Sequence, residues 1–237
     1  NDRITGKGPA NALLNFSLRG MIKFRMGMTV PTDKDGNYVL DLRGLIDIQP
    51  DMWGYLEYRN PDGQTIAIEQ PAGTSLEGGL NTSRVWGQAP AADTPVQINV
   101  QRAGSVVGMD TLVADEDGEY VAFLIDAAGR PVILQPGDVI AATFGSGGSR
   151  SLTLAPLQLS VDLAANALRG VGPAASLLGV WAYTSPDDLE TTVLTDGNGQ
   201  WSLALDTWLL GIEAGATADV LYTANGIDYT WLGAVAP

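Results

Sequence analysis

Asp33-Lys-Asp35-Gly36-Asn-Tyr38 returns twice in this chain in closely related form. The later copies are Asp115-Glu-Asp117-Gly118-Glu-Tyr120 and Asp196-Gly-Asn198-Gly199-Gln-Trp201. The shared glycine recurs after 82 and then 81 residues. Because glycine and asparagine tolerate the positive φ of a tight turn, each copy predicts a β-hairpin whose aromatic residue opens the following strand.

Two further stretches recur in the same order. The first is Ile4-Thr-Gly6-Lys-Gly8-Pro9-Ala10, followed by Val85-Trp-Gly87-Gln-Ala89-Pro90-Ala91 and Leu168-Arg-Gly170-Val-Gly172-Pro173-Ala174, with a shared glycine spaced by 81 and 83 residues. The second comprises Gln49-Pro50-Asp51, Gln135-Pro136-Gly137-Asp138 and Glu213-Ala214-Gly215. Landmarks repeated at a fixed period of this size indicate diverged copies of one structural unit.

The segments between these landmarks are typical of strands. Val96, Ile98 and Val100 alternate with polar residues, as do Leu14 and Phe16 in the first copy, and this period of two predicts a half-buried strand. A helix over residues 11–28 is disfavoured, because the aligned stretch 96–112 alternates cleanly. Short strands separated by frequent turn signals predict β-sandwiches. We therefore expect an all-β chain of three tandem repeats, over residues 1–80, 81–164 and 165–237.

The order of these landmarks resembles a known group of bacterial surface repeats. A glycine-proline entry, an alternating strand, an Asp-x-x-Gly-x-aromatic turn and a Pro-Gly-Asp turn are similar to the carboxypeptidase-regulatory-like and collagen-adhesin B-type repeats. The resemblance implies Ig-like or prealbumin-like sandwiches that serve as stalks, spacers or adhesive modules rather than as catalysts.

A connecting segment over residues 157–165 has no counterpart at either end of the chain. Two explanations remain open. The chain is a piece of a longer array whose neighbouring sequence supplies the linker strand, or a neighbouring molecule supplies it by strand addition, which would build filaments head to tail.

Composition excludes several classes of function. The net charge of −14 disfavours nucleic acid and anionic lipid as partners, and no apolar run is long enough for a membrane-spanning helix. The chain contains neither cysteine nor histidine, which removes disulfides, the commonest general base and a Ser-His-Asp triad. We expect no enzyme activity. The charge falls from −2 over residues 1–80 to −4 over 81–169 and −8 over 170–237. Drift between the repeats explains this trend, and the alternative is an electrical polarity that would favour head-to-tail contacts.

Two weak binding sites are suggested. The carboxylates of Asp115, Glu116 and Asp117 could bind calcium, which prefers hard oxygen ligands, although an aspartate that caps its own turn explains the same pattern. No other cofactor is expected. Trp208 and Trp231 could stack on carbohydrate, although tryptophans of a sandwich usually pack in its core.

The sequence thus predicts an extracellular or cell-surface structural protein of bacterial or archaeal type. In this hypothesis it is a rod-like tandem-repeat subunit of a stalk or filament that associates with itself or with neighbouring repeats head to tail. The alternatives are an adhesin or carbohydrate-binding module, and an accessory spacer of a larger secreted enzyme.

Overall fold

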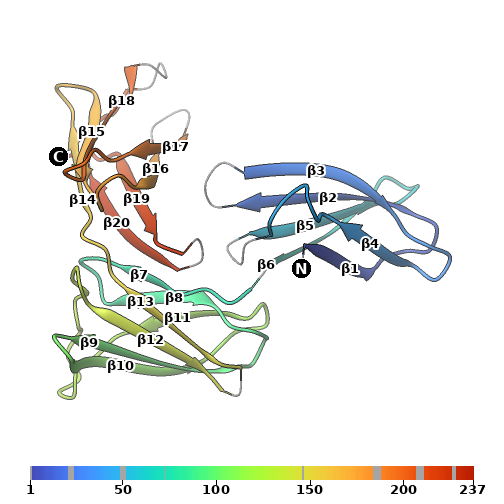
Figure 1. The fold of residues 1–237 in the computed structure, drawn as a ribbon, viewed down its shortest axis with the longest axis horizontal. Helices are drawn as coiled ribbons and strands as arrows, with labels where there is room; N and C mark the ends of the chain where they lie inside the picture. Colours follow the sequence, from blue (N-terminus) through green and yellow to red (C-terminus); the bar gives the residue numbers. More distant parts are fainter. Residues whose placement is uncertain are drawn as a thin grey trace. The chain divides into compact units, whose positions relative to one another are not determined.

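The computed structural model describes residues 2–20, 24–48, 52–71, 73–145, 147–183, 188–206, 211–225 and 228–237. These residues form β-strands joined by turns, without an α-helix (Figure 1). The described part therefore has no helix with the length and apolarity that a membrane crossing requires. The predicted all-β class is confirmed.

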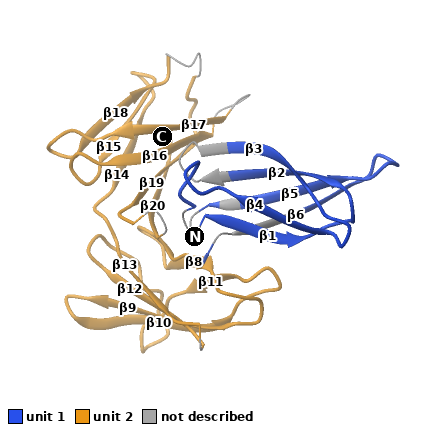
Figure 2. Ribbon diagram, turned by 45° about the vertical axis from the view of Figure 1, so that its right-hand side comes forward, with its two compact units in different colours: residues 1–73 blue, residues 74–237 orange. Residues whose placement is uncertain are grey.

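The chain divides into two compact units, Asn1–Gly73 and Thr74–Pro237, which we call unit 1 and unit 2 (Figure 2). Unit 1 has a two-stranded sheet in the order β1-β4 and a four-stranded sheet in the order β3-β2-β5-β6. Its strands are β1 (Arg3–Lys7), β2 (Leu13–Gly20), β3 (Phe24–Pro31), β4 (Asn37–Asp41), β5 (Trp53–Arg59) and β6 (Thr65–Pro71).

Unit 2 uses the same strand order twice. Its first set is β8 (Arg84–Gln88), β9 (Pro95–Arg102), β10 (Ser105–Val113), β11 (Glu119–Phe123), β12 (Val139–Phe144) and β13 (Ser149–Thr153). Its second set is β15 (Ala167–Val171), β16 (Leu177–Tyr183), β17 (Asp188–Leu194), β18 (Gln200–Ala204), β19 (Thr217–Thr223) and β20 (Tyr229–Val235). The neighbours β10-β9-β12-β13 and β17-β16-β19-β20 repeat the order of the four-stranded sheet of unit 1, and β8-β11 and β15-β18 repeat its two-stranded sheet.

Two short strands precede these sets. β7 (Glu77–Gly79) pairs with β8, and β14 (Gln158–Asp162) pairs with β15. Residues 74–80, which the sequence pattern places in the first repeat, therefore belong to unit 2. The boundary expected between residues 164 and 165 stays a prediction, because both strand sets lie in one compact unit.

The expected alternation of buried and exposed residues is confirmed. In β9, Val96, Ile98 and Val100 are fully buried, whereas Gln97 and Gln101 are exposed. In β2, the side chains of Leu14, Phe16 and Leu18 point into the core of unit 1. Most buried apolar side chains of unit 2 form one continuous cluster drawn from both strand sets.

The Asp-x-x-Gly turns do not close hairpins, so this prediction is wrong. Each turn joins strands of two different sheets, as from β10 to β11. The turn chemistry itself is as expected: Gly36, Gly118 and Gly199 have φ near +80°. The chain then crosses to the other sheet, because the aromatic residue two positions after the turn glycine pairs with a glycine of another recurring stretch. Tyr120, for example, pairs with Gly87.

Candidate functional site

Strand β7 joins the two strand sets of unit 2 into one sheet. It lies between β8 of the first set and β20 of the second, in a seven-stranded sheet of order β11-β8-β7-β20-β19-β16-β17. β7 pairs antiparallel with β8 and parallel with β20. We call the contact between β7 and β20 the junction, and it is the best-defined candidate site in the described part of the chain.

The junction is held by backbone hydrogen bonds at both ends. Glu77, Gly78 and Gly79 lie opposite Tyr229, Thr230 and Trp231. The amide of Tyr229 donates to the carbonyl of Leu76 over 3.0 Å, and the amide of Leu80 donates to the carbonyl of Trp231 over 2.8 Å. The pairing thereby satisfies backbone groups that an edge strand would leave exposed.

The two glycines allow this close packing. A Cβ on Gly78 would stand 2.6 Å from the side chains of Ile140 and Leu154, in the core below the sheet. A Cβ on Gly79 would stand 2.8 Å from the Thr82 hydroxyl and 3.1 Å from the ring of Trp231. Larger residues at these positions would push β7 away from its neighbours.

Trp231, one of the two residues predicted to bind carbohydrate, packs at the junction. Its half-buried ring meets that of Trp86 edge-on, with centroids 5.8 Å apart and an angle of 79° between the planes. The guanidinium of Arg84 lies 5.1 Å from the centroid of the Trp86 ring, a cation–π arrangement. The other residue predicted to bind carbohydrate, Trp208, lies outside the described residues.

A buried polar cluster connects the two strand sets. Arg150 of β13 forms an ion pair with Asp228, which precedes β20, with 3.3 Å between Nη1 and Oδ2. The Arg150 Nε also donates to the Thr74 hydroxyl over 2.8 Å. The other carboxylate oxygen of Asp228 is buried and has no hydrogen-bond partner among the described residues. The positive charge of Arg150 therefore offsets the cost of burying this carboxylate.

Glu77 of β7 lies close to this cluster. Burial, with a smaller contribution from the nearby charge of Asp228, raises the pKa of its carboxyl to about 7, although a hydrogen bond with Trp86 and the charge of Arg84 act to lower it. The protonation of the junction therefore changes near neutral pH.

The predicted calcium residues lie in an exposed turn. The Asp115 Oδ1 accepts hydrogen bonds from the amides of Asp117 (3.0 Å) and Glu119 (2.8 Å), and the Gln88 side chain donates to the carbonyl of Asp117 over 2.6 Å. Asp33 and Asp196 accept the same two amides in their own turns. No group of three or more acidic side chains that could hold a metal ion, Glu116 included, occurs in the described ranges. Calcium binding stays a prediction.

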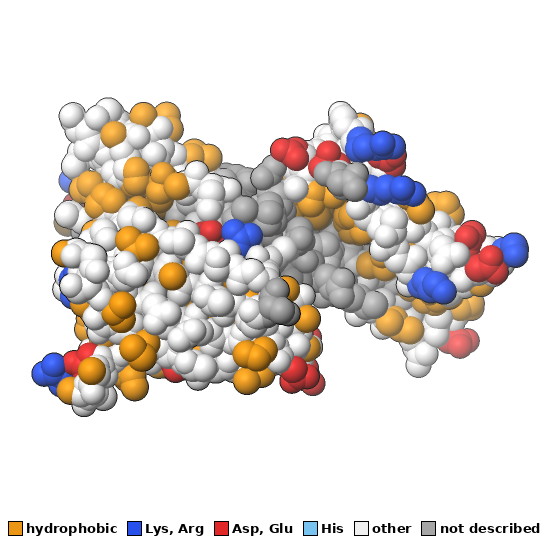
Figure 3. Space-filling model, turned by 60° about the horizontal axis from the view of Figure 1, so that its bottom comes forward, with side chains coloured by type: hydrophobic (Ala, Val, Ile, Leu, Met, Phe, Trp, Pro, Cys, Tyr) orange, Lys and Arg blue, Asp and Glu red, His pale blue; other side chains and the backbone are white. Residues whose placement is uncertain are grey.

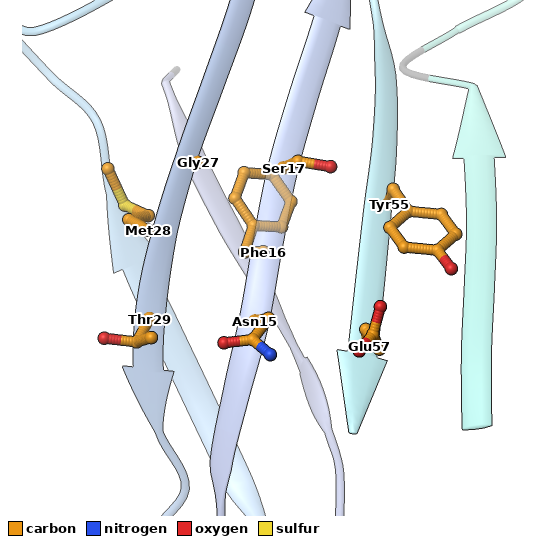
Figure 4. A pocket seen from close by; sticks show the side chains of 8 residues that line it. All are labelled: Asn15, Phe16, Ser17, Gly27, Met28, Thr29, Tyr55 and Glu57. Atoms are coloured by element: carbon orange, nitrogen blue, oxygen red, sulfur yellow. The ribbon is translucent and has the colours of Figure 1, made fainter. Parts of the chain in front are cut away.

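Unit 1 has a hollow on the outer face of its larger sheet (Figure 4). Ser17 and Gly27 leave space there beside the half-buried ring of Tyr55. Asn15 and Glu57 lie opposite each other in the adjacent row of side chains. No local sequence pattern indicates this hollow, because it depends on which residues of three strands become neighbours.

The junction was not predicted from the sequence either, although the pair Gly78-Gly79 indicates a close contact between strands. Glycines within a strand are typical of a place where another backbone approaches closely. The residues that this approach brings together, Arg150 and Asp228, are 78 positions apart, and no local pattern connects them.

Comparisons with known proteins give no family. No family model and no curated protein matches the chain. Among solved structures, it is similar to a tetra-tandem repeat in the extending region of a large adhesion protein (16% identity, 99% of this chain and 70% of that one, TM-score 0.25). It is also similar to a 1.5-MDa bacterial ice-binding adhesin (13%, 99% and 89%, TM-score 0.24) and to the chicken CNTN1 FN1-FN3 domains (10%, 99% and 94%, TM-score 0.23). At such TM-scores these similarities assign neither a family nor a function.

Proposed function

We propose that the chain is a structural subunit of an extracellular stalk or filament on a bacterial or archaeal cell surface. In this proposal its β-sandwich repeats stack head to tail and transmit force between their ends. The observation that carries the proposal is the seven-stranded sheet, in which β7 and β20 join two strand sets by backbone pairing. Neighbouring repeats that share a sheet and a core resist separation more than repeats connected by a linker alone.

The energetics of the junction support this role. Most buried apolar side chains of unit 2 form one cluster across both strand sets, and the Arg150–Asp228 ion pair crosses between them. Contacts between neighbouring repeats dominate the stability of tandem-repeat proteins. We therefore expect the two strand sets of unit 2 to unfold together.

The test is electron microscopy of the natively isolated protein together with hydrogen exchange on the full chain. We expect linear assemblies, and equal protection of the β7–β8 amides and the β19–β20 amides under conditions of global opening. Particles that stay single at every concentration would contradict the filament role. Independent opening of the two strand sets would contradict the shared sheet as its structural basis.

A second candidate function is carbohydrate binding by unit 1, as in an adhesin. It is favoured by the hollow in Figure 4, where the ring of Tyr55 lies among the polar side chains of Asn15, Ser17 and Glu57. An apolar surface with a few polar groups is typical of small-ligand sites. Saturable glycan binding that is lost in Tyr55→Ala and kept in Tyr183→Ala, an exposed tyrosine of unit 2, would support this function.

A further inference from the structure

β14 and β6 are two of the edge strands that the described sheets leave with one side unpaired. β14 is the outermost strand of the sheet β14-β15-β18 and pairs with β15 alone, and β6 is the outermost strand of β3-β2-β5-β6 and pairs with β5 alone. Such edges expose a row of backbone donors and acceptors that can accept another strand.

These two strands correspond to the two strands of the junction. We call Gly6, Gly87 and Gly170 the repeat glycines. β7 pairs with β8, where Gly78 lies opposite Val85, two residues before Gly87. β14 pairs with β15, where Val161 lies opposite Leu168, two residues before Gly170. Val161 therefore occupies the place of Gly78.

β6 and β20 correspond in the same way. Each is the last strand of its four-stranded sheet, where Ile68 lies opposite Leu56 and Leu232 lies opposite Val220. Leu56 and Val220 in turn lie opposite Phe16 and Val180, each ten residues after its repeat glycine. Counting back two residues along β6 and β20 places Ile66 at the position of Thr230.

We propose that β14 of one copy pairs in parallel with β6 of a second copy, in the register that β7 and β20 adopt. Ser160, Val161 and Asp162 then lie opposite Thr65, Ile66 and Ala67. This inference rests on the proposed function and deepens it, because it names the strands that join one copy to the next. Since different surfaces meet, each copy has one free end of each kind and the assembly is open-ended.

Side-chain size supports this pairing. In the junction the small Gly79 faces the large Trp231. At the corresponding places of the proposed contact, the larger Asp162 faces the small Ala67. Ile66 is 61% exposed on unit 1, and the pairing would cover it with Val161.

Charge supports contact between unlike units. Residues 1–73 contain eight lysines and arginines and nine acidic residues, a net charge of −1 that leaves −13 for residues 74–237. Figure 3 shows Lys and Arg side chains interspersed with Asp and Glu on unit 1, at its right. Contact between two copies of unit 2 would place strongly negative surfaces together, whereas contact between unit 2 and unit 1 largely avoids this repulsion.

Cysteine cross-linking tests the register, because the chain contains no cysteine of its own. One chain has Ser160→Cys and the other Thr65→Cys, and the two are mixed and oxidised. We expect a mixed dimer that exceeds the homodimer of either chain. The control replaces Ser160→Cys by Ser202→Cys, at an exposed position of β18 on the opposite edge of the same sheet, and we expect no enrichment of its mixed dimer. Equal cross-linking from both positions, or none from Ser160→Cys, overturns the proposal.

A charge substitution tests the same contact without cysteine. Ile66→Asp places a carboxylate against the apolar side chain of Val161 of the next copy, and we expect at least a tenfold weaker self-association in sedimentation. Leu13→Asp, at a residue that is 60% exposed on the inner strand β2, should leave association unchanged. Filaments of the native protein without the Ser160–Thr65 cross-link would keep the proposed function and reject these strands. A chain that is monomeric at all concentrations would reject both.

Discussion

Tyr120 lies directly opposite Gly87 across strands β11 and β8, and its hydroxyl occupies the space that a side chain on Gly87 would need. The hydroxyl donates a 2.8 Å hydrogen bond to the carbonyl of Ser75, just before β7. The pairs Gly6–Tyr38 and Gly170–Trp201 repeat the same relationship. An aromatic side chain that covers a glycine of the neighbouring strand is a known way of stabilising a sheet. The two landmarks of each repeat are thus the two sides of one contact.

Replacement of Gly87 should destabilise unit 2. A Cβ at this position would stand 2.2 Å from the carbonyl oxygen of Ser75, which belongs to the backbone and can move only with β7. We expect Gly87→Ala to cost about 3 kcal/mol, at the upper end for overpacking. Denaturant unfolding of the full chain measures this cost. Gly197→Ala is the control, because nothing lies within 4 Å of the added Cβ, and an equal loss in both variants would contradict the steric cause.

The stability of unit 2 should fall as the pH rises toward neutrality. The pKa of Glu77 is about 7 in the folded protein against an ordinary value of 4.5, so the folded state holds this proton more tightly than the unfolded state. The contribution is fully present below pH 4.5 and is lost as the pH rises through 7. It amounts to at most about 3 kcal/mol. Glu77→Gln should remove this dependence, and parallel pH profiles of the two proteins would contradict it.

The ion pair between Arg102 and Asp138 should stabilise unit 2 strongly. Two hydrogen bonds of 2.7 Å connect the guanidinium to a carboxylate that is only 1% exposed. Arg102→Met would leave this buried charge without its partner, and we expect a loss of about 3 kcal/mol. Arg130→Met breaks a pair in which the arginine is 77% exposed, and unfolding measurements should show almost no change, because solvent screens such a pair.

The hydroxyl of Thr195 should stabilise the turn between β15 and β16. It accepts a hydrogen bond from the Ser176 amide (2.8 Å) and donates to the carbonyl of Pro173 (2.6 Å), and the side chain is 2% exposed. Thr195→Val keeps the shape and removes both bonds, which should cost about 2 kcal/mol. Thr217→Val, at an exposed position of β19, should be neutral in the same unfolding assay, and a similar cost there would point to strand propensity instead.

The strands were predictable from the sequence because their signals are local. The alternation of Val96, Ile98 and Val100 specifies a buried face without any knowledge of the partners. The Asp-x-x-Gly turns were also recognised, but the sheet that the chain joins after each turn was not. That choice depends on contacts such as Gly118 with Ala89, whose amide donates to the Gly118 carbonyl over 2.8 Å.

The junction could not be predicted from the sequence, because its contacts also form only in the tertiary fold. β7 has three residues, too few for a hydrophobic period, and its partner β20 begins 150 positions after the end of β7. Trp231 could be recognised as important from its residue type alone. Its packing against Gly79 and Trp86 follows only from the tertiary fold.

The parallel direction of β7 and β20 has a mechanical consequence. When unit 2 is stretched between residues 74 and 237, the force acts just before β7 and just after β20. Because the two strands run the same way, this tension drags them past each other in opposite directions. Their hydrogen bonds are then loaded together in shear, rather than being peeled apart one at a time from a hairpin end. The shared sheet would therefore act as a clamp against stretching.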